Sequence, residues 1–196
     1  MPKTPTTNET FYAQDRQAWR DWLEANHASK TGVWLIYYKK GSGKPRVAYD
    51  EAVEEALCFG WVDSRPNAID EERYMQLFSP RKAKSPWSRL NKERVKRLID
   101  AGLMTAAGLT KIEAAQADGS WGDYDTVEDL SVPPDLEAAL DESPTARAHF
   151  EGFSPSSQKV ILWWIASAKR PETRQKRIEE TVQLAAKNIK ANHYRQ

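Results

Sequence analysis

The first part of the chain alternates between helical and extended patterns of apolar positions. Apolar residues spaced three and four apart predict a helix from Asp15, a residue type that favours the N-cap, to Asn26. The continuous β-branched and aromatic run Val33–Tyr38 predicts a central strand that is buried on both faces. A short extended piece at residues 10–12 precedes both.

A second helix and a pair of strands follow. Asp50 can cap a helix over residues 51–59, and the segments Trp61–Ser64 and Arg73–Ser79 predict two strands around a polar turn. The strongest helix start of the chain lies at Ser85, because a serine there is followed by a proline suited to the first helical position. We therefore expect an α+β fold, with a small antiparallel or mixed sheet and helices packed on it.

The second part of the chain has helical periodicity throughout. Residues 117–133 are rich in Asp, Gly and Ser and end in two prolines, which predicts a linker. Apolar positions three and four apart then recur up to residue 190. The sequence thus predicts a disordered N-terminus at residues 1–9, an α+β domain at 10–116, a linker at 117–133 and an all-helical module at 134–192.

Composition agrees with a folded protein that holds no metal. Hydrophobic residues make up 40% of the chain and charged residues 29%, unlike a disordered sequence. Each of the eight tryptophans can bury roughly 150–250 Å², so we expect them to anchor the core. A single cysteine excludes an intrachain disulfide and four-cysteine metal sites, and the three histidines lack ligand spacing. No metal site and no cofactor are predicted.

The start of the chain lacks the apolar stretch of an export signal, and no later run approaches the roughly 18 apolar residues of a membrane span. We expect a cytoplasmic protein. Charge is distributed in blocks, since residues 81–111 carry 9 basic and 2 acidic side chains whereas residues 112–151 carry 1 and 11. The blocks are either solvated surfaces that neutralise each other or, in the basic block, an anion site.

A candidate anion site lies where residues 79–82 lead into the helix expected from Ser85. Helix N-termini present free backbone N–H groups and a positive dipole end, and arginine can bind an anion through two N–H groups. The candidate ligand-binding residues are Trp61, Arg81, Lys82, Ser85, Trp87, Ser88 and Asn91. The alternative is structural: the serines cap the helix, and Arg81 pairs with an acidic residue such as Asp63.

Two other functions have weaker support. Cys58 lies near a helix C-terminus, which disfavours a thiolate. Asp63 is a lone carboxylate, which is a weak signal for a general base. An enzyme that uses Asp63 and Cys58 is therefore an alternative with less support. Basic side chains on the helix after Ser85 suggest nucleic-acid binding, but the acidic block and a pI of about 7.8 argue against it.

Three sequence strings together resemble one bacterial family. They are ALCFGWVDS at Ala56–Ser64, SPRKAKSPWSRLNKERVKRLI at Ser79–Ile99, and PPDLEAAL with AKRPETRQKRI between Pro133 and Ile178. Their order and spacing resemble the YdeI/OmpD-associated family of uncharacterised proteins, also called bacteriocin-protection proteins. The resemblance implies a CyaY-like α+β domain followed by the family's C-terminal helical module.

The family names imply protection from bacteriocins or antimicrobial peptides and association with an outer-membrane porin. A porin partner requires export, and the missing export signal argues against that association. The combined prediction is a non-catalytic stress- or bacteriocin-protection protein with a small-anion site. Its expected partners are a small anionic ligand or another protein, with nucleic acid disfavoured.

Overall fold

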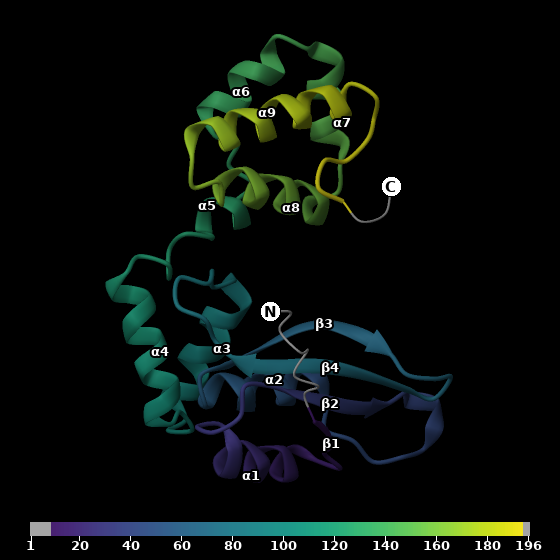
Figure 1. The fold of residues 1–196 in the computed structure, drawn as a ribbon, viewed down its shortest axis with the longest axis vertical. Helices are drawn as coiled ribbons and strands as arrows, with labels where there is room; N and C mark the ends of the chain where they lie inside the picture. Colours follow the sequence, from purple (N-terminus) through teal and green to yellow (C-terminus); the bar gives the residue numbers. More distant parts are fainter. Residues whose placement is uncertain (1–8, 194–196) are drawn as a thin grey trace, which may run out of the picture. The chain divides into compact units, whose positions relative to one another are not determined.

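A computed structural model describes residues 9–193 of the chain (Figure 1). The chain divides into two compact units between Gly122 and Asp123. The N-terminal unit contains a four-stranded sheet with helices, and the C-terminal unit is helical. This confirms the expected α+β class. The disordered N-terminus expected at residues 1–9 lies, except for residue 9, outside the described residues.

The sheet is mixed, with strand order β1-β2-β4-β3. Strand β1 runs parallel to β2, whereas β4 is antiparallel to both β2 and β3. The bounds are Thr10–Tyr12 for β1, Val33–Tyr38 for β2, Trp61–Ala68 for β3 and Arg73–Pro80 for β4. Strand β3 continues beyond the predicted segment Trp61–Ser64, because β4 supplies it with backbone partners as far as Ala68, near the turn that joins them. Strand β4 is longer than predicted only by Pro80, which pairs with Trp61.

Strand β2 is buried on one face, so the prediction of burial on both faces was wrong. Val33, Leu35 and Tyr37 are fully buried, whereas the alternate residues Trp34, Ile36 and Tyr38 are only half-buried. The helices α1 (Arg16–Asn26) and α2 (Tyr49–Cys58) lie along one side of the sheet (Figure 1) and pack with the buried residues in one core. Side chains alternate across a strand, so one covering layer buries every second residue.

Local chemistry explains where these two helices begin. The Asp15 carboxylate accepts a hydrogen bond from the backbone N–H of Ala18 at 2.8 Å, as expected for the N-cap of α1. Asp50 does not cap α2, contrary to prediction. The helix starts two residues earlier than predicted, and the carboxylate of Glu51 instead accepts from the backbone N–H of Ala48 at 3.1 Å.

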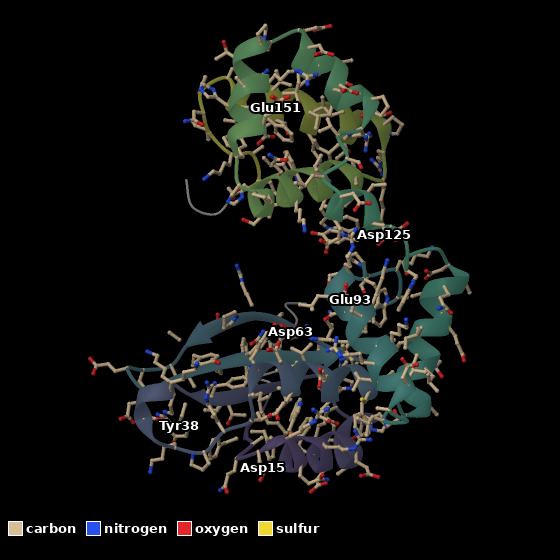
Figure 2. The ribbon with its side chains drawn as sticks, turned by 180° about the vertical axis from the view of Figure 1, so that it is seen from behind. Asp15, Tyr38, Asp63, Glu93, Asp125 and Glu151 are labelled. Carbon is tan, nitrogen blue, oxygen red and sulfur yellow. The ribbon has the colours of Figure 1, made fainter. Side chains whose placement is uncertain are left out.

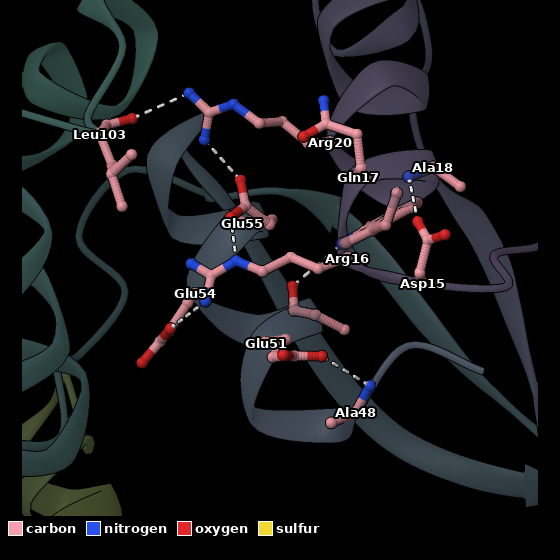
Figure 3. Close-up of polar contacts among 12 residues, drawn as sticks. Asp15, Arg16, Gln17, Ala18, Arg20, Ala48, Glu51, Glu54, Glu55 and Leu103 are labelled. Carbon is pink, nitrogen blue, oxygen red and sulfur yellow. Dashed lines mark hydrogen bonds and ion pairs between the residues drawn. The ribbon is translucent and has the colours of Figure 1, made fainter. Parts of the chain in front are cut away.

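Buried ion pairs join α1 to α2 (Figure 3). Glu55 of α2 is only 2% exposed, and its two carboxylate oxygens accept from Arg16 at 2.6 Å and from Arg20 at 2.5 Å. Arg16 also pairs with the more exposed Glu54 at 3.1 Å. Arg20 donates in addition to the backbone carbonyl of Leu103, so this network reaches the segment before the next helix.

Two further helices complete the N-terminal unit, and one of them was not predicted. Helix α3 (Arg89–Asp100) precedes α4 (Ala106–Ala117), whose sequence lacks a clear apolar stripe. A Cβ atom on Gly108 of α4 would lie 2.8 Å from the carbonyl oxygen of Leu57, so only glycine permits this approach to α2. Thr105 also donates from its hydroxyl to the carbonyl of Cys58 at 2.6 Å.

The tryptophans contribute unequally to the core. Trp19, Trp61 and Trp87 are buried in the core of the N-terminal unit, whereas the other five tryptophans are half-buried. Four of these five still pack against a core, Trp22 and Trp121 in the N-terminal unit and Trp163 and Trp164 in the C-terminal unit, so the expectation is wrong only for Trp34. A residue as large as tryptophan commonly leaves one edge at the surface.

The C-terminal unit has its own core and five helices among its described residues. These are α5 (Asp125–Glu128), α6 (Pro134–Asp141), α7 (Pro144–Gly152), α8 (Pro155–Ala166) and α9 (Pro171–Ala185). Four of them start with proline. Proline has no backbone N–H, and in the first turn of a helix that N–H would have no acceptor within the helix. The range 117–133, for which composition predicts a linker, includes α5, and Val127 is buried in this core. Between residues 9 and 193, no helix is both long and apolar enough to cross a membrane.

Candidate functional site

Four of the seven candidate ligand residues line one small hollow in the N-terminal unit. These are Arg81, Lys82, Ser85 and Trp87, which belong to the segment that follows β4. The opposite wall comes from the C-terminal half of α4 and the loop after it, with Lys111, Asp118 and Ser120. This cavity of about 60 Å³ is called the basic hollow below.

Arg81 forms the buried part of the basic hollow. Its backbone N–H donates to the carbonyl of Gly60 at 2.9 Å, which holds it directly beyond the β3–β4 pair. The side chain is 4% exposed, and its guanidinium lies over the Trp87 ring with 3.6 Å between the central carbon and the ring centroid. A guanidinium stacked on an indole is stabilised by the electron-rich face of the ring.

The hydrogen bonds of Arg81 are incomplete. One terminal nitrogen donates to the backbone carbonyl of Pro86, but the Nε–H group is buried and has no partner among residues 9–193. No described carboxylate forms an ion pair with it. Burial lowers the pKa of Arg81 to about 10, and the more distant charge of Asp63 only partly opposes this. The expected pairing of Arg81 with Asp63 is therefore limited to this longer-range attraction.

The charge of the basic hollow is strongly positive. Arg81, Lys82, Lys84 and Lys111 face a single carboxylate, Asp118, so four positive charges and one negative charge leave a net charge of +3. The Ser120 hydroxyl, the backbone N–H of Ser120, which donates to Asp118 at 3.0 Å, and the Lys84 charge lower the pKa of the Asp118 carboxyl, in this order of effect. Ser120 is buried.

The dipole of α4 opposes anion binding in the basic hollow, but only weakly. The hollow borders the C-terminal end of α4, where a helix has the equivalent of roughly half a negative charge. Against a net side-chain charge of +3, this effect is small. The hollow therefore remains attractive to anions.

Helix α3 does not supply the N-terminus expected at this site. It begins at Arg89 with Ser88 as N-cap, so the predicted start at Ser85 was wrong. Residues 82–85 instead form a turn, in which the Ser85 hydroxyl donates to the carbonyl of Lys82 at 2.7 Å and Lys84 has a left-handed φ of 58°. The left-handed residue interrupts helical geometry before α3 can start.

Three candidate ligand residues lie outside the basic hollow. The Ser88 hydroxyl accepts from the backbone N–H of Asn91 at 3.3 Å, and the Asn91 side chain accepts from Arg94 at 3.0 Å. Trp61 is 1% exposed and donates from its indole to the carbonyl of His27 at 3.2 Å. Their polar groups are thus used in the fold.

The weak catalytic candidates are separate and have structural partners. Asp63 lies on β3, as Figure 2 shows, and accepts from the Tyr49 hydroxyl at 2.9 Å and from Gln76 at 2.6 Å. Cys58 is fully buried, and burial, with a smaller effect of the Glu55 charge, raises the pKa of its thiol to about 11. A thiol with a raised pKa is a poor nucleophile at neutral pH.

The sequence analysis missed Lys111, Asp118 and Ser120. Lys111 belongs to the basic block at 81–111, so block charge was the signal that could have suggested it. Asp118 and Ser120 follow the helix that was not predicted. No group of three or more His, Cys, Asp or Glu side chains within the described part of the chain is placed to hold a metal ion.

Comparison with known families assigns both units. A family model described as a domain of unknown function, DUF8412, matches residues 11–111, about half of the chain. A second model, described as bacteriocin-protection, YdeI or OmpD-associated, matches residues 129–188. The chain belongs to the DUF8412 family and carries a YdeI/OmpD-associated module. The family resemblance seen in the sequence is thereby confirmed.

A curated relative supports the same assignment. The chain is 33% identical over 64 residues to the uncharacterized protein YdeI of Bacillus subtilis (strain 168), and the match covers 32% of each chain. The match thus spans about a third of the length of this relative. No solved structure matches the chain.

Proposed function

We propose that this YdeI/OmpD-associated protein is non-catalytic and binds a small anion in the basic hollow. The observation that carries the proposal is the buried Arg81, whose Nε–H has no hydrogen-bond partner and whose charge has no ion-pair partner among residues 9–193. A buried cation and a buried unpaired donor both cost free energy, and folded proteins usually provide partners for them. A bound anion would supply the missing counter-charge.

The size of the basic hollow favours a compact anion over a polyanion. A cavity of about 60 Å³ admits one small charged group, whereas a nucleic acid requires an extended basic surface that contacts several phosphates. An enzyme built on Cys58 and Asp63 is less consistent with the buried thiol and with a carboxylate that is already hydrogen-bonded.

The cellular role is proposed on the family description alone. Protection from bacteriocins names a phenotype, and anion binding would be one molecular property through which such a protein acts. The cytoplasmic location expected from the sequence stays a prediction.

Isothermal titration of the full chain with phosphate, sulfate and acetate tests the proposed site. We expect the wild type to bind at least one of these anions, and Arg81→Met to weaken that binding at least tenfold because it removes the buried donor and charge. Arg81→Lys, which keeps the charge but lacks the Nε–H donor, should also bind more weakly than the wild type. Lys96→Met is the matched control, since Lys96 is exposed on α3 and does not line the hollow.

Circular dichroism of each variant separates loss of the site from loss of the fold. If the wild type binds none of the three anions, the proposal fails, and Arg81 is then a structural residue held by Trp87 and Pro86. Equal weakening by Lys96→Met and Arg81→Met would also contradict a local site, because it would indicate attraction to the overall charge.

A further inference from the structure

The charge and accessibility of the basic hollow indicate which kind of small anion it binds. This inference rests on the proposed function. Two features of the site bear on it: the number of positive charges and the accessibility of the lysines. The charge distinguishes a doubly charged ligand from a singly charged one, and the accessibility indicates how the ligand lies.

The net charge exceeds what one monoanion neutralises. Arg81, Lys82, Lys84 and Lys111 against Asp118 leave +3, so a monoanion would leave +2 and a dianion +1. Electrostatic attraction is proportional to the charge of the ligand, and it is stronger beside a buried side chain than in water. The hollow should therefore discriminate in favour of a dianion of the same size.

Accessibility differs between the two ends of the basic hollow. Arg81 is buried, Lys111 is half-buried, and Lys82 and Lys84 are exposed. A ligand can thus place its charge close to the Arg81 guanidinium while its oxygens face lysine ammonium groups near the solvent. The cavity holds only a head group, so any further part of the ligand must extend into solvent.

We infer that the basic hollow binds the dianionic head group of a phosphomonoester, or inorganic phosphate itself, in preference to any monoanion. A tetrahedral phosphate has several acceptor oxygens for the convergent donors, and arginine and lysine together are common phosphate partners. The lysines can also be solvated surface charges that bind no ligand. The two explanations differ in what they predict for ligand charge.

Methyl phosphate and methanesulfonate form a matched pair of probes for isothermal titration of the full chain. They share a tetrahedral head and a methyl group, but the phosphate is a dianion above its second pKa of about 6, whereas the sulfonate is a monoanion at all working pH values. We expect methyl phosphate to bind at least tenfold more tightly at pH 7.5. At pH 5.0 this preference should largely disappear, since about nine-tenths of the ester is then a monoanion.

Methanesulfonate also controls for titration of the protein. The charged groups that face the ligand are Arg81, Lys82, Lys84, Lys111 and Asp118, and Asp63 acts on Arg81 from β3. The pKa of the Asp118 carboxyl is lowered below its usual value, so this group stays ionised between pH 5.0 and 7.5. A change in protein charge would alter the binding of both probes, so the ratio of their affinities isolates the charge of the ligand.

Variants connect the preference to the lysines. Lys111→Met and Lys82→Met should each reduce the affinity ratio of methyl phosphate to methanesulfonate several-fold at pH 7.5, while Lys96→Met leaves it unchanged. Inorganic phosphate compared with methyl phosphate distinguishes the free ion from an ester: tighter binding of the free ion would indicate that the methyl group is excluded.

Equal affinity for the two matched probes at pH 7.5 would overturn the inference but leave the proposed anion site intact. An unchanged ratio in both lysine variants would overturn it as well. Failure of the wild type to bind either probe, phosphate, sulfate or acetate would remove the proposed function together with the inference.

Discussion

At the scale of single residues, burial alters the ionisation of two side chains in opposite directions. The pKa of Arg81 is lowered and the pKa of Cys58 is raised, because in both cases the charged form loses contact with water. The consequences differ. Arg81 remains charged at neutral pH and has no ion-pair partner among residues 9–193, whereas Cys58 remains a neutral thiol packed in the core.

The thiol of Cys58 should make folding stability depend on pH above about 9. Its pKa is about 11 in the folded chain and about 9 as the ordinary value, so the unfolded state ionises first. The stability that comes from the neutral thiol is present below pH 9 and is lost as the pH rises to 11. Wild type should lose about 2–3 kcal/mol of unfolding free energy over this range relative to Cys58→Ala.

Urea unfolding of wild type and Cys58→Ala at pH 8, 9, 10 and 11 measures this loss. Both proteins share every other titrating group, so only their difference is informative. A difference that stays constant with pH would contradict the assigned environment of the thiol.

At the scale of elements, α1 is joined to α2 by charged groups as well as by apolar packing. Arg16 and Arg20 lie one turn apart on α1, and both reach the buried Glu55 of α2 (Figure 3). Residues four apart lie on the same side of a helix, which explains why a single carboxylate can bind both. The sequence analysis did not identify this network, because the partners are more than thirty positions apart.

Glu55→Gln should destabilise the N-terminal unit by about 2–4 kcal/mol, because it leaves two arginines beside a buried neutral amide. Glu54→Gln is the matched control: it removes a neighbouring carboxylate that also contacts Arg16 but is more exposed, and it should cost about 1 kcal/mol or less. Chemical denaturation followed by circular dichroism compares the two variants. A similar loss of unfolding free energy in both variants would show that the burial of Glu55 does not make its ion pairs contribute more than those of Glu54.

At the scale of the whole molecule, the two units have separate cores. The clusters of buried apolar residues share no member, and the division falls at Gly122 and Asp123. The core of the C-terminal unit includes Val127, which lies in the range expected to be a linker. A fragment that starts after residue 133 would therefore lack part of its core.

The fragment 123–196 should fold by itself and melt cooperatively, because it contains its complete core. The shorter fragment 134–196 should be less stable, since it lacks α5 and Val127, and loss of a buried valine alone typically costs about 1–3 kcal/mol. Helical circular dichroism and thermal melts of both fragments check this. Equal melting temperatures would support the linker predicted from composition.

Much of the N-terminal unit could be predicted from local patterns. The strand at Val33–Tyr38 and the cap at Asp15 depend on side-chain properties within a few residues. The basic block also pointed to the segment around Arg81. Helix α4 could not be recognised in this way, because its contact with α2 depends on the absence of a side chain at Gly108 rather than on an apolar stripe.

The sequence alone determined the class of fold, the family resemblance and part of the candidate site, since these follow from residue types and their spacing. The tertiary structure decided which cations share one cavity, because α4 brings Lys111 beside a residue thirty positions earlier in the chain. It also decided that Arg81 is buried without an ion-pair partner among residues 9–193. Burial and pairing depend on what surrounds a side chain in space, and neighbours along the chain do not determine those surroundings.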